Sequence, residues 1–232
     1  MQRMNTPTLE THPTSVDLAA AHSGETPATV APSASRLRKE ASIRAQAQAH
    51  FARFGFDGAS LESIAADAGM SRHSLLYYFP SKEALYRSVL DEVLVAWLGD
   101  MGKLSDSDDP FVAVQAYIEA KMRITQNHPQ GVRVFTQEVL AGAPRYKSVL
   151  MERVVPSLRA DVGRFERWAD EGRITRIDFT HLMFLIWAMT QAYADHEAQF
   201  ALYLGKERLD SSDYASCTQL MVRMVLGALR VC

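Results

Sequence analysis

The chain has 232 residues, 47% of them hydrophobic and 22% charged, and carries a net charge of −2 at pH 7. These values are close to those of an ordinary soluble protein with a real hydrophobic core, and the length suits a small domain followed by a larger one. The sequence has no apolar run near the ~18–20 residues that cross a bilayer and no secretory signal, and Cys217 and Cys232 form no CxxC motif or Cys/His cluster. We therefore expect a cytoplasmic protein with no membrane partner, no metal site and no disulfide framework.

The charge is distributed unevenly along the chain. Residues 36–87 carry eight Lys and Arg against five acidic residues, whereas residues 88–232 carry sixteen against nineteen. The positive charge is thus concentrated in one short N-terminal module, but an excess of three charges over about fifty residues is not a strong field and is weak evidence for nucleic-acid binding by itself. Residues 1–35 are rich in Thr, Pro, Ser and Ala and poor in large apolar side chains, which predicts a disordered tail.

Four helices are predicted after the tail. The first shows a helical apolar stripe and stops at Gly55, because glycine commonly ends a helix. A serine precedes each of the others and can cap it, and Gly69 and Pro80 end the second and third. The fourth runs to about Met101. The residues behind these assignments are Ile43, Ala47, Phe51 and Phe54 for the first stripe, Leu61, Ile64, Ala65 and Ala68 for the second, and Ser60, Ser71 and Ser81 as caps.

The remainder is also predicted to be helical, so that the fold class is all-α. We expect helices at about 110–128, 130–142, 145–171, 179–203 and 211–230, with Pro156 kinking or splitting the third of them. The domains are then a tail (1–35), a helix-turn-helix DNA-binding domain (36–82) and a C-terminal effector-binding and dimerisation domain (83–232).

Two short helices joined by a glycine turn, from Ser60 to Phe79, are typical of a helix-turn-helix. The first helix braces the second, whose N-terminal residues can reach base edges in the major groove while other side chains contact phosphates. Leu75 and Phe79 should face the core, which leaves Arg72 free to bind guanine or phosphate. The candidate DNA-binding residues are Arg36, Arg38, Lys39, Ser60, Ser71, Arg72, His73, Ser74, Leu76, Tyr77, Tyr78 and Lys82. From spacing alone, a plain helical hairpin with a solvated polar face is equally compatible.

The stretch GFDGASLESIAADAGMSRHSLLYYFPSKEAL, residues 55–85, closely resembles the DNA-binding domain of the TetR family. The resemblance implies a homodimer in which two recognition helices read a palindromic operator, and a ligand in the C-terminal body that changes their separation. Repression is the implied mode of regulation. One departure is visible: Leu76 stands where many members have Tyr, so a phosphate contact through that hydroxyl is in doubt, whereas Tyr78 can still donate one.

Three further stretches, around Trp97, at 138–144 (EVLAGAP) and at 186–195 (IWAMTQAYAD), resemble the RutR-like subfamily of pyrimidine-utilisation regulators within that family. This resemblance spans most of residues 36–230 and is much weaker at 101–135 and 145–180. It implies a small-molecule effector such as uracil or thymine.

The residues of the predicted helix 179–203 also suggest a pocket. Phe184, Trp187, Gln191, Asp195 and Ala198 share one face, and a buried Gln and Asp need hydrogen-bond partners. The Gln191 amide offers a donor and an acceptor to a planar amide edge, and the two tryptophans can sandwich a flat ring or donate through the indole N–H. The candidate effector-binding residues are Trp97, Trp187, Gln191 and Asp195. From spacing alone the alternative is favoured, in which Gln191 and Asp195 satisfy one another or a partner chain within a dimer interface and the tryptophans fill the core.

The predicted dimer surface is an apolar stripe on the last two helices, formed by Leu182, Leu185, Met189, Leu220, Met224 and Leu226–Gly227. The fourth helix carries Trp97 and joins the DNA-binding domain near Lys82. We therefore predict that a movement of this helix transmits ligand binding to the DNA-binding domain.

An enzyme is the main rival class, but no GxSxG, HExxH or Gly-rich loop is present, and His128, His181 and His196 are scattered. We expect no catalytic residues and no cofactor. A regulator that binds DNA could also use its body for dimerisation or protein docking alone, without any small molecule. A regulator whose effector is larger and apolar or aromatic is also compatible with the sequence, although Gln191 and Asp195 argue against it.

Overall fold

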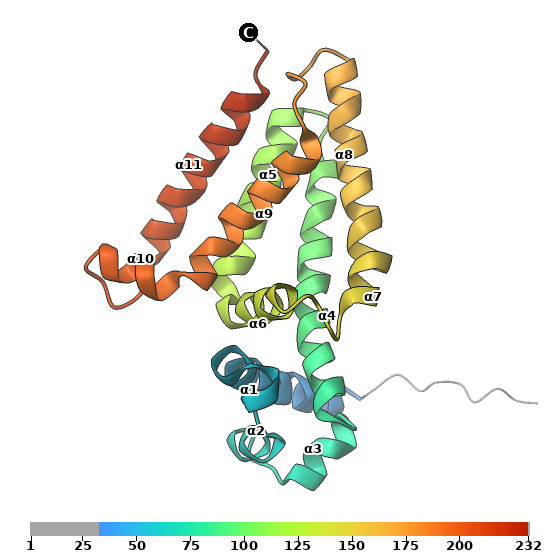
Figure 1. Ribbon diagram of the computed structural model, residues 1–232, viewed down its shortest axis with the longest axis vertical. Coiled ribbons are helices and arrows are strands. Elements are labelled where there is room, and N and C mark those ends of the chain that lie inside the picture. Colours follow the sequence, from blue (N-terminus) through green and yellow to red (C-terminus); the bar gives the residue numbers. More distant parts are fainter. Residues whose placement is uncertain (1–32, 232) are drawn as a thin grey trace, which may run out of the picture. The chain divides into compact units, whose positions relative to one another are not determined.

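The computed structural model describes residues 33–231, and every regular element in that range is helical (Figure 1). The all-α class is therefore confirmed. No helix in the described range is long and apolar enough to span a bilayer. The elements are α1 (Ala34–Gly58), α2 (Leu61–Asp67), α3 (Arg72–Tyr78), α4 (Lys82–Met101), a 3₁₀ turn (Gly102–Ser105), α5 (Pro110–Asn127), α6 (Pro129–Leu140), α7 (Lys147–Val149), a π-helical turn (Leu150–Val154), α8 (Val155–Asp170), α9 (Phe179–Asp195), α10 (Glu197–Tyr203) and α11 (Ser211–Leu229).

The predicted tail lies almost wholly outside the described residues. Its last two positions, 34 and 35, are helical, because α1 begins at Ala34 rather than at Arg36. From Ala34 onward the chain forms one compact unit. The boundary predicted after residue 82 falls at the start of α4. This helix continues without a break from the N-terminal helices α1 to α3 into the C-terminal helices, which we call the body (Figure 1).

Helices α1 to α3 and the start of α4 form the reading head. Ile43, Ala47 and Phe51 are buried in α1, as their spacing predicts. The spacing places Phe54 on the same stripe, but its side chain is 48% exposed. It lies on the flank of α1, where its ring contacts His50 and the Arg53 guanidinium instead of the core.

The caps and turns of the head follow the sequence closely. The hydroxyls of Ser60, Ser71 and Ser81 accept hydrogen bonds from the backbone N–H groups three residues later. Gly55 interrupts α1 with φ of 69°. Gly69 has the same positive φ, and the Met70 N–H beyond it bonds to the Ala65 carbonyl, which closes the end of α2 in a Schellman turn. The turn between α2 and α3 is thus set locally.

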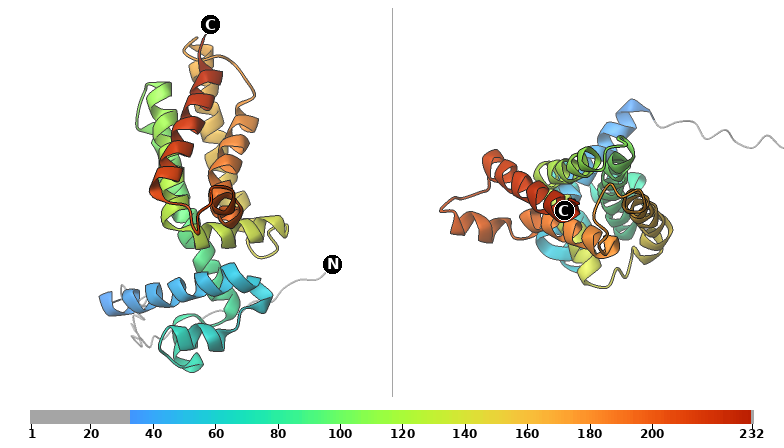
Figure 2. Two further views of the ribbon diagram at one scale, coloured as in Figure 1. Left: turned by 90° about the vertical axis from the view of Figure 1, so that its left-hand side faces the viewer. Right: turned by 90° about the horizontal axis from the view of Figure 1, so that it is seen from above.

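In the body, α5 packs against α4, α9 and α11, and α8 covers the other side of α4 and α9 (Figures 1 and 2). The core between them is formed by large apolar side chains, including Tyr117, Phe165, Phe179 and Met183. Helix α6 lies across the end of the body and contacts both α1 and α4, so that it forms the main junction with the reading head.

Two predicted helices of the body are divided in the structure. The segment 145–171 begins at Lys147 and passes through the π-helical turn before Pro156, whose ring and missing N–H disrupt a regular helix. The segment 179–203 breaks at His196, which has φ of −111° and ψ of 19°. Arg133 donates to the Ala194 carbonyl just before this break and satisfies a helix end that the sequence pattern does not reveal.

Gly131 fixes how closely α6 approaches α4, and its replacement by alanine is expected to destabilise the protein by about 1–2 kcal/mol. A Cβ at this position would lie 2.8 Å from Cγ2 of Val93, whose stiff side chain cannot easily move. Gly163 in α8 is the matched control, because its nearest neighbour, Nη1 of Arg167, is 4.0 Å away. Gly163→Ala should stabilise by up to about 1 kcal/mol through helix propensity. Urea unfolding measures the free energy of unfolding of both variants. A change of the same sign in the two would contradict this account.

Candidate DNA-binding and effector sites

The recognition helix α3 presents polar side chains at its N-terminal end. Arg72, His73 and Ser74 are exposed, whereas Leu75 and Phe79 are buried beneath them as predicted. Nε of Arg72 lies 2.8 Å from Oε1 of Glu62 on α2. Both side chains are more than half exposed, so this ion pair is weak and can be exchanged for a contact to DNA at small cost.

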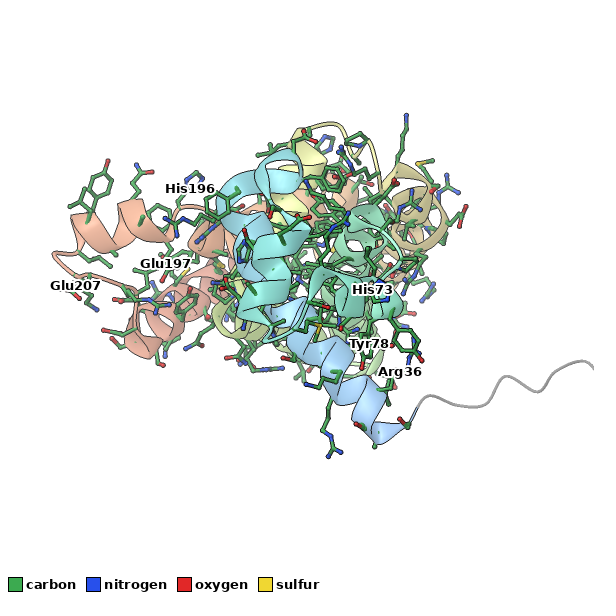
Figure 3. All side chains as sticks on the ribbon, turned by 90° about the horizontal axis from the view of Figure 1, so that it is seen from below. Arg36, His73, Tyr78, His196, Glu197 and Glu207 are labelled. Atoms are coloured by element: carbon green, nitrogen blue, oxygen red, sulfur yellow. The ribbon has the colours of Figure 1, made fainter. Side chains whose placement is uncertain are left out.

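The N-terminal end of α1 meets the other end of α3. The Arg36 guanidinium lies 5.4 Å and 5.6 Å from the ring centroids of Tyr77 and Tyr78. Figure 3, which views the head from below, shows Arg36, Tyr78 and His73 in the same region. Arg38 and Lys39 are exposed on α1 near this end. The structure therefore brings Arg36 beside the recognition helix and leaves Arg38 and Lys39 exposed in the same turns of α1.

The remaining candidates on the head are engaged within the protein. The hydroxyls of Ser60 and Ser71 act as helix caps. Leu76 is half-buried against the core. Nζ of Lys82 donates to the Asp57 carbonyl at 3.1 Å and lies 4.8 Å from the Phe56 ring centroid. In this structure Lys82 thus joins α4 to the end of α1.

A cavity of about 460 Å³ lies between α4, α5, α6, α8 and α9. Most of its walls are apolar, and three of the lining side chains, Val139, Leu140 and Phe184, are exposed, so that the cavity opens to solvent on their side. It is lined by Leu94, Trp97, Lys121, Phe135, Thr136, Val139, Leu140, Leu150, Val154, Val155, Leu158, Phe184, Trp187 and Gln191.

Polar groups from three helices converge on this cavity. Nζ of Lys121, a residue that is 3% exposed, lies 4.5 Å from the ring of Trp97 and 5.7 Å from that of Trp187. Nε1 of Trp187 donates to the Tyr117 hydroxyl at 2.7 Å, so only Trp97 keeps its indole N–H for another partner. The ammonium group of Lys121 thus lies near the rings of both tryptophans. The Gln191 amide makes no hydrogen bond within the described residues.

Buried polar atoms without a partner gather around the same cavity. Within residues 33–231 they are Nε1 of Trp97, Oγ1 of Thr136, Oδ2 of Asp161 and Oδ1 of Asp195. Trp97 and Thr136 line the cavity, and Asp161 interacts with the cavity residue Lys121. The Asp195 carboxyl and the Thr136 side chain are close enough to influence each other, but the Thr136 hydroxyl oxygen and Oδ1 of Asp195 form no hydrogen bond of good geometry. Such atoms are rare in folded proteins, so their grouping marks a place where a bound molecule or water completes the structure.

Burial raises the pKa of two carboxyl groups near the cavity. Burial raises the pKa of Asp161 to about 7, although the nearby Arg164 and Lys121 charges oppose this shift. Burial also raises the pKa of Asp195 above its usual value. Asp195 does not line the cavity, contrary to its place in the predicted set. One helical turn beyond Gln191, its carboxyl faces Thr136 rather than the open space.

Lys121 and Thr136 line the cavity, and Asp161 interacts with Lys121, but the sequence pattern indicated none of the three. A signal was present for Lys121, which continues the apolar stripe of Val114, Tyr117 and Ile118 at helical spacing, although a lysine in that position usually lies at a surface. Thr136 and Asp161 have no comparable signal, because only the packing of α6 and α8 on the other helices places them here.

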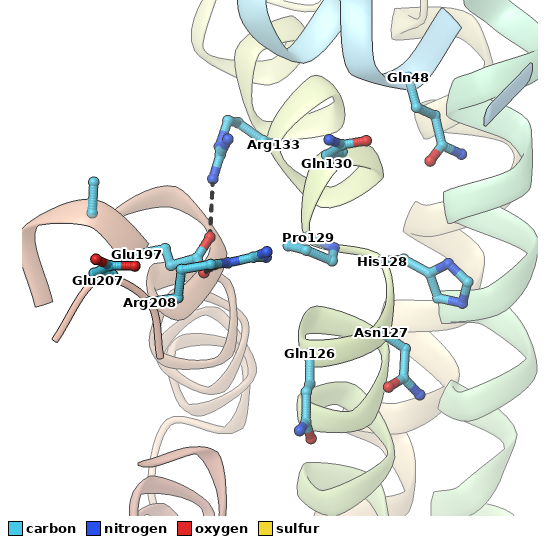
Figure 4. A pocket seen from close by; sticks show the side chains of 11 residues that line it. Gln48, Gln126, Asn127, His128, Pro129, Gln130, Arg133, Glu197, Glu207 and Arg208 are labelled. Atoms are coloured by element: carbon cyan, nitrogen blue, oxygen red, sulfur yellow. Dashed lines mark ion pairs between the residues drawn. The ribbon is translucent and has the colours of Figure 1, made fainter. Parts of the chain in front are cut away.

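A second, larger cleft of about 650 Å³ is polar and lies where α5, α6 and α10 meet (Figure 4). Its lining includes Gln48, Asn127 and Arg133, and Nη2 of Arg133 lies 3.6 Å from Oε2 of Glu197. None of the buried atoms that lack a partner lines this cleft. Arg133 and Arg208 of this cleft both pair with Glu197, so the smaller cavity is the stronger candidate for a ligand.

Comparison with known proteins decides the family. The sequence model described as "Bacterial regulatory proteins, tetR family" matches residues 43–89, and the C-terminal TetR model described as "YcdC-like protein, C-terminal region" matches residues 90–231. The chain belongs to the TetR family. The HTH-type transcriptional regulator RutR of Escherichia coli K12 is 36% identical over 196 residues, covering 83% of this chain and 91% of that protein. The HTH-type transcriptional regulator EthR of Mycolicibacterium smegmatis is 30% identical over 201 residues, covering 83% and 88%.

Solved structures of this TetR-family member's relatives share its fold. The ketosteroid transcriptional regulator KstR2 of Mycobacterium tuberculosis superposes with a TM-score of 0.64 at 20% identity, covering 83% of this chain and 95% of that chain. AibR, solved with isovaleryl coenzyme A and operator DNA, gives 0.65 at 16% identity, covering 80% and 97%. By its two family models and its identity to RutR, this TetR-type protein is a RutR-like transcriptional regulator, which confirms the predicted class of regulator rather than enzyme.

Proposed function

We propose that this regulator binds a palindromic operator as a homodimer in the cytoplasm, and that a small planar effector, a pyrimidine such as uracil or thymine, enters the cavity and releases it from DNA. The observation that carries the effector half of this proposal is the gathering of partnerless buried polar atoms around one cavity. The resemblance of the 186–195 stretch to pyrimidine-utilisation regulators supports the choice of ligand.

The polar end of the cavity suits a ring with alternating carbonyl and N–H groups. Lys121 and Trp97 offer donors to carbonyl oxygens, and the Gln191 amide can pair with an adjoining O=C–N–H edge. The apolar walls bury the faces of the ring. A ligand that lacks these polar groups would leave the buried indole N–H of Trp97 unpaired, which is a strong source of discrimination for a small site.

The dimer surface is proposed to lie on α9 and α11. Leu185, Leu220 and Met224 are 60%, 49% and 56% exposed. Exposed apolar side chains in a helical stripe are typical of an interface. One predicted member differs, because Leu182 is buried within the chain's own core. Met189 is partly buried against that core and stays in the proposed interface.

Arg72 is proposed to read the operator, and Arg72→Ala should weaken operator binding by about tenfold to a hundredfold, the range expected when one base contact is lost. Exposed Arg167 on α8 is the control, because it carries the same charge far from the head along the chain. Fluorescence anisotropy with a DNA site selected from a random pool by the wild type measures both variants. Equal affinities for Arg72→Ala and Arg167→Ala would remove Arg72 from the reading surface.

The proposed mechanism follows from linkage. A ligand shifts a regulator between two states only through its different affinities for them. Leu94 and Trp97 of α4 line the cavity, and the same helix begins at Lys82 in the reading head. A ligand that displaces α4 therefore changes the position of the head and the spacing of two heads in a dimer.

The function is tested with the selected DNA site. The wild type should bind it as two chains per duplex by analytical ultracentrifugation, and saturating uracil or thymine should lower the affinity, by about 5–150-fold for a typical coupling between sites. Other nucleobases, acyl chains and aromatic acids form the comparison panel. Affinity unchanged by either pyrimidine would contradict the pyrimidine proposal.

A larger amphipathic effector is the second candidate, favoured by the volume of about 460 Å³ and the mainly apolar walls. A pyrimidine occupies the polar end and leaves the region near Leu150 and Val154 to additional groups. Release of the DNA by an acyl chain or aromatic acid, and not by uracil or thymine, would establish this candidate. Release by no compound of the panel would favour a body that serves dimerisation or protein docking alone.

A further inference from the structure

The loop between α6 and α7 joins two walls of the cavity. Val139 and Leu140 line it before the loop, and Leu150 and Val154 line it afterwards. The loop reverses in a Schellman turn, in which the N–H groups of Gly142 and Ala143 bond to the carbonyls of Val139 and Glu138. Ala143 has φ of 55°, a left-handed conformation that non-glycine residues rarely adopt. The position of this loop is therefore specified by the end of α6 that faces the cavity.

Glu138 anchors the loop from within. It is 3% exposed, and its Oε1 accepts a hydrogen bond of 2.6 Å from the backbone N–H of Arg145. The same carboxylate interacts with the hydroxyl of Tyr86 on α4, and burial together with this carboxylate raises the Tyr86 pKa. Glu138 thus ties the loop to α6 and α4 at once.

The Arg145 side chain reaches from the loop to the reading head. Its Cζ lies 3.7 Å from the centroid of the Phe56 ring, and its Nη2 lies 3.5 Å from Oδ1 of Asp57. The Asp57 side chain is 93% exposed, so its attraction for the guanidinium is weak, and the Phe56 ring provides most of the attachment. Lys82 also lies near that ring, at 4.8 Å.

Phe56 lies at the junction between α1 and the helix-turn-helix. It lies near the end of α1, a few residues before Ser60 caps α2, the first helix of the helix-turn-helix. Its ring also packs edge-on against Tyr86, with the centroids 5.0 Å apart. A displacement of Phe56 therefore changes the angle at which α2 and α3 leave α1.

We propose that Arg145 is a positioning residue that transmits occupancy of the cavity to the helix-turn-helix through Phe56. The inference rests on the proposed ligand site, because a ligand pressing on Val139 and Leu140 moves the end of α6, the loop and Arg145 together. Gln137 on the same helix donates to the Ala52 carbonyl, so α6 also holds α1 at a second point.

Arg145→Met tests the proposal, since methionine keeps an apolar contact with Phe56 and removes the guanidinium. We expect pyrimidine binding by calorimetry to change less than about twofold, while the pyrimidine-induced loss of operator affinity falls to less than about threefold from a wild-type value within about 5–150-fold. Arg145→Lys should restore part of the response. Arg153→Met is the control. Arg153 lies in the π-helical turn that follows α7, and its Nη1 is 3.9 Å from Oδ1 of Asp91 rather than beside Phe56. A full response in Arg145→Met would overturn the proposal.

Amide hydrogen exchange tests the contact between Arg145 and Phe56 in the absence of any ligand. Amide exchange of residues 56–60 should be faster in Arg145→Met than in Arg153→Met, and equal exchange in the two variants would overturn the role of Arg145. If the wild type binds no pyrimidine, the proposed effector fails by itself, and the exchange result still decides whether Arg145 positions the head.

Discussion

Lys121→Met is expected to abolish the response to uracil and thymine while the protein remains folded. Lys121 supplies the only ammonium group among the residues that line the cavity, and it lies near both tryptophan rings. A site built around a buried hydrogen-bond donor loses about 10²–10⁴ in affinity when that donor is removed. Calorimetric titration and operator release should both show the loss.

The fold should survive this change because methionine has a similar length and suits an apolar wall. Replacing a buried charge by an apolar side chain is often neutral or stabilising, provided that no opposite charge is left behind. Asp161, the acidic partner, can take up a proton, since burial already raises its pKa to about 7. Lys147→Met, at an exposed position of α7, is the control and should respond as the wild type does. Unchanged pyrimidine affinity in Lys121→Met would exclude Lys121 from the binding site.

Asp161→Asn is expected to remove a pH dependence of stability of about 3 kcal/mol between about pH 5 and pH 8. The ordinary pKa of 3.8 is raised to about 7 in the folded protein, mainly by burial. Between these two values the folded state keeps a proton that the unfolded state has released. Stability therefore falls as the pH rises through this window and levels off above about 7, where both states are ionised.

Urea unfolding at acidic and mildly alkaline pH measures this difference in the wild type and in the variant. Asp106→Asn is the control, because Asp106 is exposed and should leave the wild-type dependence in place. The same loss of stability toward alkaline pH in Asp161→Asn as in the wild type would show that another group takes up the proton. The experiment also concerns the ligand site, since the Asp161 carboxyl interacts electrostatically with the ammonium group of Lys121.

The reading head was predictable because its signals are local. Ser60 and Ser71 cap helices through their own backbone neighbours, and Gly69 sets the turn through its own φ. The buried face followed from spacing, with Phe54 as the exception, since its side chain lies on an exposed flank of α1. None of these features depends on how distant segments pack.

The effector cavity was predictable only in part. Trp97, Trp187 and Gln191 line it, because their helices face it as the sequence pattern indicates. Asp195 shares that helical face, yet the break after α9 and the packing of α6 direct it toward Thr136 instead. Arg145 and Asp161 acquire their roles from contacts between segments far apart in the chain, and a single sequence carries no signal for such contacts.

The central claim is that the cavity between α4, α5, α6, α8 and α9 binds a small carbonyl-bearing ring. Isothermal titration of uracil and thymine into the wild-type protein, repeated with Lys121→Met and Gln191→Ala, tests it most directly. The expected result is saturable binding of one pyrimidine per chain that is lost in both variants. Absence of binding by either pyrimidine to the folded wild type, or full binding to both variants, would contradict the claim.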